Sequence, residues 1–388
     1  MRESMKDRVA IVGVGCTRFG DHFDESYEDL AVEAAFAAFA DARIEPERVD
    51  AAWLGTFSPY AGHGKASVSL ADALRLYGKP ITRVENYCAT GTDAFRNAAM
   101  AVASGVYEVA LVLGVEKLKD RPTRGLSWEG GHPYQHDGLT APGVFAMAAN
   151  RYFHCFGGGR ETLARVSVKN HHNGAMNPKA HFQMEVTEEQ VLKAPIVAWP
   201  FGLFDCCPTT DGAAAAVICR ADMARQFRED YVLVKGLGLA VTSGRPWYDP
   251  ANDYVGFAAT RAAADEAYRM AGVSDPVGEI DLAEVHDCFT WTEISNYEDL
   301  GFCRKGEGAA FVSEGRSALT GDMPVNPSGG LKSFGHPIGA SGVRMIYEVV
   351  TQLRGEAGAR QVRDAELGLV HNLGGPGSVA CVVVLGRD

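Results

Sequence analysis

The stretch "ENYCATGTDAFRNAAMAVASG", residues 85–105, places one cysteine between a run of β-forming residues and a helix. The segment "ITRVENY" just before it has the composition of a strand. From Thr90 onward, apolar residues recur at helical spacing and the pattern stops at Gly105. We therefore expect Cys88 to lie at a strand-to-helix corner, where free backbone N–H groups and a partial positive charge stabilise a thiolate and lower the thiol pKa.

Position alone leaves two roles open for Cys88. A free cysteine behaves as a small apolar residue and is commonly buried for structural reasons. A thiol at a helix start becomes chemically useful only when a base and a substrate lie nearby. The segments on either side of this stretch decide between the two roles.

Strand-like and helix-like segments alternate in two successive rounds along the chain, which predicts a duplicated α/β fold. The predicted strands lie at 8–15, 51–57, 81–88, 109–116, 231–243, 281–289, 366–375 and 379–386. The predicted helices lie near 27–43, 67–77, 90–105, 258–271 and 293–300, and within 335–355.

Between the two rounds the alternation fails, and residues 118–203 are rich in Gly, Pro, His and aromatic residues. An insertion of this length is usually functional. The segment 204–228, which contains "FDCCPTTDGAAAAVICR", then predicts a buried strand that returns to the first sheet. We expect an N-terminal half of residues 1–117 completed by that segment, a loop insertion over the substrate site, and a C-terminal half of residues 229–388.

Composition excludes several classes of function. The 388 residues carry a formal net charge of −12, so nucleic acid and anionic membrane surfaces are not expected partners. The nine cysteines are scattered without a CxxC pair, which predicts neither a disulfide framework nor a metal site, and favours a reducing compartment. The charged N-terminus runs straight into a strand and no apolar run reaches ~18 residues, so we expect a cytoplasmic protein.

The first strand ends in "GVGCTRFG", which has some likeness to a dinucleotide-binding loop. Arg18 stands where the third glycine of that loop is needed. We therefore interpret Gly13 and Gly15 as parts of a close-packed turn.

Three further segments carry groups suited to chemistry. In "NPSGGLKSFGHPIGASG", residues 326–342, glycines surround His336 just before a helix, so a ligand can approach an imidazole whose pKa lies near neutrality. In "AEVHDCF", His286 and Cys288 follow an apolar strand and would point to one face if the strand continued. In "HNLGGPGS", three glycines follow another strand, where backbone amides can approach a bound atom.

Together, "NYCATGTDAFRNA", "HDCF", "GHPIGASG" and "NLGGPG" resemble the thiolase superfamily in order and spacing, over nearly the whole chain. The likeness is greatest to the sterol-carrier-protein thiolases and the archaeal-type acetyl-CoA acetyltransferases, in which "HDCF" replaces "NEAF". It implies a duplicated fold layered α-β-α-β-α. It also implies CoA as a substrate and no permanently bound cofactor.

The resemblance implies roles for individual residues. Cys88 would attack a 3-ketoacyl-CoA, with His336 as its base. His336 and His286 would stabilise the enolate, and the backbone N–H groups of Cys88 and Gly374 would bind the oxyanion of the tetrahedral adduct. Ordinary thiolases have a cysteine where Asn372 stands here, and Cys288 would take over its acid/base duty.

The resemblance leaves partners and reaction open. Thiolases form dimers or larger oligomers, and some relatives work with a small OB-fold and zinc-ribbon protein. Those relatives include aldolases that do not need the nucleophilic cysteine, and a non-catalytic acyl-CoA or lipid binder is a third alternative. Cys88 together with His336 favours the thiolase, in the cleavage or the condensation direction.

The acyl group is not fixed by the sequence. Large side chains in the insertion are compatible with a bulky or aromatic acyl group, as in benzoylsuccinyl-CoA, and equally with a filled core and acetoacetyl-CoA as substrate. These side chains are Trp128, Tyr134, Phe145, Met147, Tyr152 and Phe153.

Overall fold

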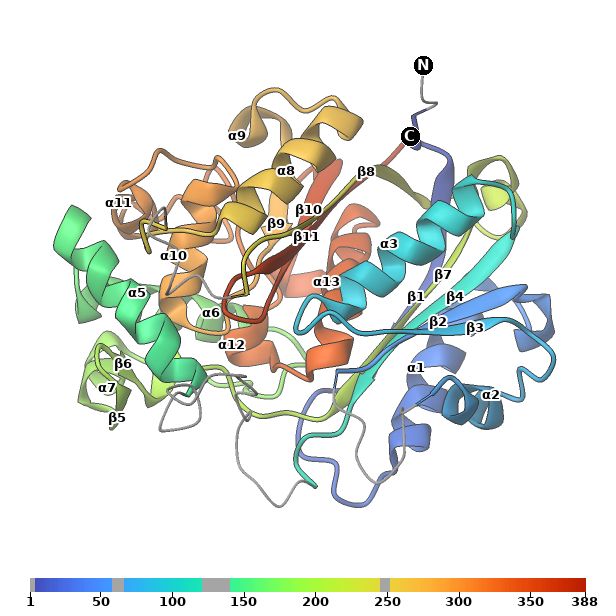
Figure 1. Ribbon diagram of the computed structural model, residues 1–388, viewed down its shortest axis with the longest axis horizontal. Coiled ribbons are helices and arrows are strands. Elements are labelled where there is room, and N and C mark those ends of the chain that lie inside the picture. Colours follow the sequence, from blue (N-terminus) through green and yellow to red (C-terminus); the bar gives the residue numbers. More distant parts are fainter. Residues whose placement is uncertain (1–3, 58–65, 121–139, 245–251) are drawn as a thin grey trace.

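Nine strands of the computed structural model form one sheet in the order β3-β2-β4-β7-β1-β8-β11-β10-β9 (Figure 1). The structure describes residues 4–57, 66–120, 140–244 and 252–388. The strands of this sheet are β1 (Val9–Cys16), β2 (Ala51–Gly55), β3 (Ile81–Val84), β4 (Val109–Glu116), β7 (Gly212–Arg220), β8 (Val232–Val241), β9 (Leu282–Glu284), β10 (Leu367–Gly374) and β11 (Val379–Gly386).

Helices cover this sheet and also lie between its two halves. They are α1 (Tyr27–Ala42), α2 (Val68–Leu74), α3 (Thr90–Ala103), α5 (Ala141–Phe156), α6 (Arg160–Ala175), α7 (Glu188–Lys193), α8 (Ala258–Ala271), α9 (Pro276–Glu279), α10 (Thr290–Asp299), α11 (Gly308–Ser313), α12 (Gly330–Phe334) and α13 (Ile338–Leu353).

The predicted duplication is confirmed by the strand pairing. In the N-terminal half, β2 is parallel to β4, β4 is antiparallel to β7, and β7 is antiparallel to β1. In the C-terminal half, β9, β10, β11 and β8 repeat this pattern in the same order. The halves meet where β1 pairs with β8 at only two positions, Ala10 with Leu233 and Ile11 with Val232.

The helices form the predicted layers. α1 packs on β1 and β7, and α8 packs on β8 and β11, so these two helices cover the outer faces of the halves. α3 and α13 pack against each other between the halves, with α3 on β2 and β4 and α13 on β4, β7 and β10. The result is the α-β-α-β-α arrangement, in which the starts of α3 and α13 share the central layer (Figure 1).

Glycines in the two central strands allow the outer helices to approach closely. A Cβ atom on Gly13 would lie 2.3 Å from the backbone oxygen of Ala38 in α1, and Gly15 meets the same helix. A Cβ atom on Gly236 in β8 would lie 2.2 Å from the backbone oxygen of Ala267 in α8. The expectation of a turn at Gly13 and Gly15 was therefore wrong, because both belong to β1.

The described part of residues 118–203 is largely helical rather than a loop. It contains α5, α6, α7 and a hairpin of β5 (Ile196–Ala198) and β6 (Phe201–Gly202). The Thr140 hydroxyl accepts a hydrogen bond from the Gly143 N–H (3.2 Å) at the start of α5, and Gly157 ends that helix at φ 81°. The Gly and Pro content that suggested a loop therefore includes residues at the ends of helices.

Two boundaries near the predicted site differ from expectation. β9 ends at Glu284, so His286 and Cys288 lie in the connection to α10 and not in a strand. The helix predicted near 293–300 begins at Thr290.

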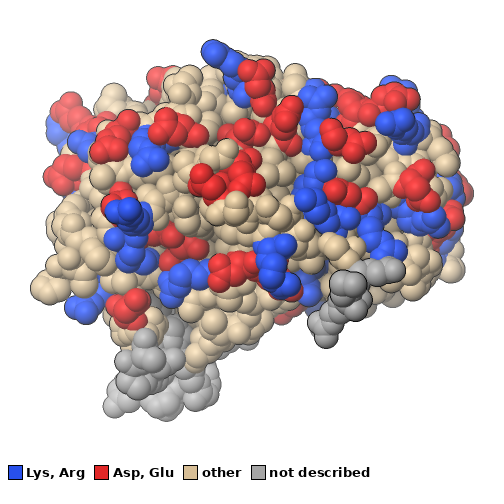
Figure 2. All heavy atoms as spheres, turned by 90° about the horizontal axis from the view of Figure 1, so that it is seen from above, with Lys and Arg blue, Asp and Glu red and all other residues tan. Residues whose placement is uncertain are grey.

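The surface agrees with the charge pattern of the sequence. Figure 2 shows Lys and Arg interspersed with Asp and Glu over one face, without a broad area of either sign. Within the described ranges, no helix is both long and apolar enough to cross a membrane.

Candidate active site

Three of the predicted site residues come together from distant parts of the chain. The Cys88 sulfur and one ring nitrogen each of His286 and His336 all lie within 4.8 Å of one another. Cys88 precedes α3, His286 lies between β9 and α10, and His336 lies just before α13. The N-terminal half therefore supplies a thiol and the C-terminal half supplies two imidazoles.

A tight turn presents Cys88 at the predicted strand-to-helix corner. Tyr87 has φ 50°, a left-handed conformation that costs a non-glycine residue about 1–2 kcal/mol. The Thr90 hydroxyl accepts from the Asn86 N–H (2.8 Å) and donates to the Tyr87 carbonyl (2.5 Å). Backbone strain of this kind is typical of functional sites, where the surroundings hold the strained residue in place.

The environment of Cys88 does not produce a resting thiolate. Burial raises the pKa of the Cys88 thiol to about 12, and the nearby carboxylates of Glu116 and Glu85 act in the same direction. The expectation of a lowered pKa was therefore wrong. The thiol precedes the N-cap residue Ala89, and the loss of hydration outweighs the field of the helix start.

His336 is arranged to accept a proton. The Ser341 hydroxyl donates its single hydrogen to the Pro337 carbonyl (3.0 Å), so it accepts from Nδ1–H of His336 (2.7 Å). The lone pair of His336 then lies on Nε2, which is buried without a hydrogen-bond partner among the described residues. Burial and the charge of Arg344 lower the pKa of His336 to about 3, so the free ring is neutral.

His286 has the opposite tautomer. The Asn372 side-chain amide donates to Nδ1 of His286 (3.2 Å), which leaves the hydrogen on Nε2. Burial is the largest cause that keeps the pKa of His286 well below its usual value, and the positive charge of Arg344 acts in the same direction. The two rings meet edge-to-face with centroids 5.2 Å apart, so an acceptor nitrogen and a donor nitrogen are available together.

Asn372 was noted from the sequence only as a missing cysteine. Its carbonyl oxygen lies 3.3 Å from the Thr92 hydroxyl, which also lies 3.0 Å from the Ala89 carbonyl, and its amide nitrogen contacts His286. The Asn372–His286 contact has no sequence signal, because the two residues are 86 positions apart, whereas Ser341 follows His336 by five residues in the motif "GHPIGASG".

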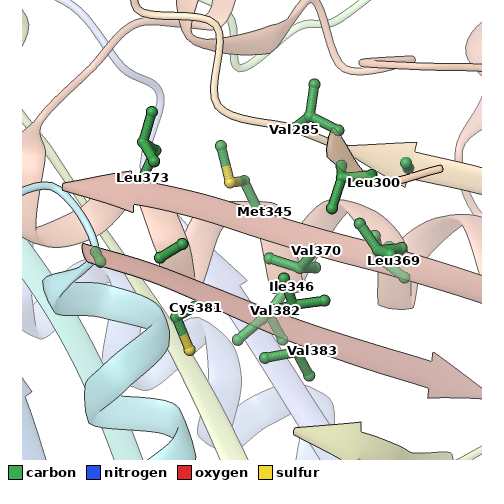
Figure 3. Packing of buried hydrophobic residues seen from close by; sticks show 14 of the residues in the cluster. Val285, Leu300, Met345, Ile346, Leu369, Val370, Leu373, Cys381, Val382 and Val383 are labelled. Carbon is green, nitrogen blue, oxygen red and sulfur yellow. The ribbon is translucent and has the colours of Figure 1, made fainter. Parts of the chain in front are cut away.

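Cys288 is buried, but its sulfur is not among the three atoms that lie within 4.8 Å of one another. Its pKa is raised well above the ordinary thiol value by burial first, and then by Cys207 and Cys88. The Cys207 N–H donates to the Cys288 carbonyl (2.9 Å), and the Cys288 sulfur lies 3.8 Å from the Thr292 hydroxyl. Cys381, in contrast, lies on β11 among apolar side chains such as Val382 and Val383 (Figure 3).

The backbone at Gly374 approaches the turn that carries Cys88. A Cβ atom on Gly374 would lie 2.8 Å from the Asn86 carbonyl oxygen and 3.1 Å from Cβ of Tyr87. A side chain at this position would push the end of β10 away from Cys88. The glycine therefore permits the approach that was predicted for an oxyanion-binding N–H group.

Two buried carboxylates support the site, and sequence reasoning missed both as site elements. Glu116 accepts from the Gly339 N–H (2.9 Å) and so ties β4 to the start of α13. Asp287 accepts from the N–H groups of Leu331 (2.5 Å) and Lys332 (3.2 Å) at the start of α12. They hold the chain on either side of His336 in place.

The thiol and the two imidazoles are also the donor types that zinc prefers. The separate tautomers of His286 and His336 suit proton transfer to a nucleophile without a metal. A thiol close to two neutral imidazoles is an arrangement suited to covalent thiol catalysis.

Comparison with known proteins agrees with an enzyme that uses a catalytic thiol. The model for the thiolase N-terminal domain matches residues 9–222, and the model for the thiolase C-terminal domain-like family matches residues 247–387. The chain belongs to the thiolase family.

Curated relatives match over nearly the full chain. An acetyl-CoA acetyltransferase of Methanothermobacter thermautotrophicus is 44% identical and covers 99% of this chain and 100% of the relative. Human sterol carrier protein 2 is 36% identical over 96% of this chain and 71% of its own length. The benzoylsuccinyl-CoA thiolase subunit BbsB of Thauera aromatica is 33% identical over 96% of both chains. These relatives confirm the predicted likeness to the archaeal-type acetyl-CoA acetyltransferases and the sterol-carrier-protein thiolases.

A solved structure titled Ltp2-ChsH2(DUF35) aldolase has a TM-score of 0.87 and 27% identity, and the match covers 100% of this chain and 99% of that one. With its family and these relatives, the present chain is an enzyme of the acyltransferase class. The alternative of a non-catalytic binder is therefore not retained.

Proposed function

We propose that this enzyme cleaves a 3-ketoacyl-CoA with CoA, through an acyl-enzyme on Cys88, and catalyses the reverse Claisen condensation. In cleavage, R–CO–CH₂–CO–S–CoA and CoA–SH give R–CO–S–CoA and acetyl-CoA. The observation that carries the proposal has two parts: a ring nitrogen of His336 lies within 4.8 Å of the Cys88 sulfur, and Nε2 of His336 is buried without a hydrogen-bond partner among the described residues.

The first step joins proton transfer to bond formation. A thiol with a pKa of about 12 does not ionise by itself near neutral pH, and an imidazole with a pKa of about 3 does not hold a proton alone. Nε2 of His336 takes the proton as the sulfur adds to the ketone carbon. The thiolate character exists only while the carbon–sulfur bond forms, which limits side reactions of the free thiol.

The adduct then breaks its carbon–carbon bond and releases the enolate of acetyl-CoA. The enolate oxygen is stabilised by Nε2–H of His286 together with His336, and Cys288 protonates the methylene carbon. The adduct oxygen is bound by the backbone N–H groups of Cys88 and Gly374, which is supported by the close approach of Gly374. Losing one such donor commonly costs ~3 kcal/mol of barrier.

In the second half, the Cys288 thiolate takes the proton of CoA–SH and the CoA sulfur attacks the Cys88 thioester. The Cys88 sulfur leaves and recovers its proton from Nε2–H of His336. CoA is a substrate here, and the scheme needs no permanently bound cofactor. We also retain the cytoplasm as the expected location, because all nine cysteines of the chain are free thiols in the structure.

The direct test is a thiolysis assay with acetoacetyl-CoA and CoA, in which acetyl-CoA is quantified by chromatography. A pulse of 3-ketoacyl-CoA without CoA should add an acyl mass to the peptide that contains Cys88. An acyl mass on another peptide, or cleavage that proceeds unchanged after Cys88→Ala, would refute the covalent scheme.

A retro-aldolase is a second candidate, which is favoured by the likeness to the aldolase structure. Such a reaction releases a free aldehyde or ketone, consumes no CoA, and does not need Cys88. Product analysis with and without CoA separates the candidates, because only the thiolase produces a second CoA thioester. The Cys88–His336 pair supports the thiolase.

We further propose that the enzyme works as a dimer or larger oligomer with a small OB-fold partner. The edge strand β3 pairs only with β2 among the described strands, and such an edge is open to pairing with another chain. The partner rests on the archaeal-type likeness and on the DUF35 protein named with the aldolase structure. Light scattering, and activity with and without the co-expressed partner, test both parts; a fully active monomer would contradict them.

A further inference from the structure

Asn326 opens the glycine-rich motif that contains His336, but its hydrogen bonds lead to His286. The residue is wholly buried, and its backbone has φ 56°, the left-handed conformation that glycine and, less often, asparagine adopt. A buried polar side chain needs hydrogen-bond partners, and those partners show which part of the chain it supports.

The Asn326 side chain forms a hydrogen bond through each of its two polar atoms. Its carbonyl oxygen accepts from the Val285 N–H (2.8 Å), and its amide nitrogen donates to a carboxylate oxygen of Glu293 (2.7 Å). The amide has only one orientation that satisfies both partners, because the backbone N–H needs an acceptor and the carboxylate needs a donor. Glu293 is itself held by an ion pair with Lys169 (2.9 Å).

These bonds hold the chain at the point where it leaves the sheet and reaches His286. β9 has already ended, and the Val285 N–H donates to Asn326. On the other side, the His286 carbonyl accepts from the side-chain amide of Asn296 (2.8 Å) in α10. The Asn372 amide contacts Nδ1 of the ring (3.2 Å). Three asparagines therefore hold the backbone on either side of His286 and its imidazole.

The insertion supports Asn326 through helix α6. The Asn173 side-chain amide donates to the Asn326 carbonyl (2.9 Å), and the Lys169 ammonium donates to the Val325 carbonyl (2.7 Å). The large side chains of the insertion that were expected to shape the acyl pocket lie elsewhere: Phe145, Tyr152 and Phe153 pack in or against the core, Met147 is half exposed, and Trp128 and Tyr134 lie outside the described residues. In its described part, the insertion thus contributes polar support to the segment that holds His286.

We propose that Asn326 is a positioning residue for His286, and that it directs Nε2–H of His286 towards the enolate oxygen by holding the backbone. This inference rests on the proposed function, in which that N–H stabilises the enolate of acetyl-CoA. Asn326 acts on the backbone and takes no part in proton transfer, so its loss should slow only the steps that form or use the enolate. A catalytic group displaced by about 1 Å can cost about 10²-fold in rate.

The test compares two reactions of the same active site. Cleavage of acetoacetyl-CoA by CoA passes through the enolate. Exchange of labelled CoA into acetyl-CoA transfers the acetyl group to Cys88 and back, so it uses the same acyl-enzyme without an enolate. Asn326→Gly removes the side chain, and glycine adopts φ 56° without strain. In this variant we expect cleavage to fall by about 10²-fold while exchange stays near the parent rate.

Gln352→Ala is the matched control, at the end of α13 far from His336. Gln352 is also a buried amide: its oxygen accepts from the Val362 N–H (2.8 Å), and its nitrogen donates to the Glu348 carboxylate (2.9 Å). Its replacement removes the same kinds of hydrogen bond, so urea unfolding should show a loss of stability. Cleavage and exchange should both keep the parent rates in this variant.

A double variant tests whether the effect passes through His286. His286→Ala should slow cleavage, and adding Asn326→Gly should slow it no further, because the group to be positioned is already absent. A further loss as large as that of Asn326→Gly alone would overturn the proposal. An equal loss of cleavage and exchange in Asn326→Gly would also overturn it, because the role would then be structural.

Failure of the proposed function gives a different result. If the parent enzyme neither cleaves acetoacetyl-CoA nor exchanges CoA, the proposed function fails, and NMR of isotope-labelled histidines decides the positioning. Asn326→Gly should shift the ring nitrogen resonances of His286, which are assigned with His286→Ala. It should leave in place those of His22, which contacts Glu25 between β1 and α1. Unchanged His286 resonances, or equal shifts of both histidines, would refute the proposal.

Discussion

The two halves of the sheet repeat one plan, but they bring different chemistry to the same place. β1 packs on α1 through Gly13 as β8 packs on α8 through Gly236. The central helices are also equivalent, because α3 leads into β4 and α13 leads towards β10. Cys88 stands just before α3 and His336 just before α13, so the duplication places the proposed nucleophile and the proposed base at matching helix starts. Equivalent positions therefore carry different side chains, while the packing of the outer helices is the same in both halves.

Removing Cys88, the group that the N-terminal half contributes, should have the largest effect on the thiolysis rate. Cys88→Ala removes the only atom that forms the acyl bond, so we expect thiolysis to fall by about 10⁴-fold or more. Mass spectrometry of the Cys88 peptide measures the loss of acylation, and a steady-state assay measures the loss of thiolysis. Cys155→Ala, at an exposed position on α5, is the matched control and should retain full activity.

Removing the matching group of the C-terminal half should have the next largest effect. His336→Asn abolishes the acceptor nitrogen, and loss of a general base commonly costs about 10²–10⁴-fold in rate. His172→Asn, on an exposed histidine paired with Glu185, provides the control. If His336→Asn kept the parent rate, His336 would not be the base, and the two matching helix starts would not serve one reaction.

Cys288 and Cys381, two cysteines of the C-terminal half, should differ in their effect on turnover. We expect Cys288→Ala to lower kcat by about 10²-fold, because the carbanion loses its proton donor. Cys381→Ala should change turnover little, since burial raises the pKa of that thiol to about 12 within an apolar strand. If Cys288→Ala kept its turnover and Cys381→Ala lost it, Cys381 and not Cys288 would be the acid/base.

The ionisation of the Cys88 thiol in the free enzyme can be followed by its dependence on pH. A Cys88 pKa of about 12 lies above its ordinary value, so the thiolate fraction of the free enzyme rises about tenfold per pH unit through the neutral range. Alkylation of Cys88 by iodoacetamide should follow this slope between about pH 6 and 9. A plateau in that range would show that a thiolate–imidazolium pair forms before substrate binds.

The smallest expected effects concern stability, and they test the repeated packing. Gly13→Ala and Gly236→Ala each place a Cβ against a helix backbone, at 2.3 and 2.2 Å, so each should lower the free energy of unfolding by about 1–3 kcal/mol. Gly20→Ala is the control, because the nearest atom to its Cβ is a side-chain nitrogen at 3.9 Å. Urea unfolding compares the three variants, and a large loss in only one half would show that the halves are not equivalent in packing.

Much of this arrangement could be predicted from the sequence. Cys88 and His336 each occupy a helix start that local patterns predict, and the strand 212–220 is apolar enough to be recognised. The tautomers depend on Ser341 and Asn372, and the thiol pKa depends on burial and on Glu116. Asn372 and Glu116 are brought to the site from distant parts of the chain, so no local pattern contains their effects, whereas Ser341 lies five residues after His336 in the same motif.

The place of β7 in the sheet has a consequence for synthesis of the chain. β4 and β1 do not touch each other; both pair with β7, which follows β4 by roughly a hundred residues. At a translation rate of about 5–20 residues per second, the growing polypeptide leaves the ribosome with those two edges unpaired for roughly 5–20 seconds. Such edges can pair with other chains. We therefore expect the ribosome-bound N-terminal half to depend on chaperones until β7 has emerged.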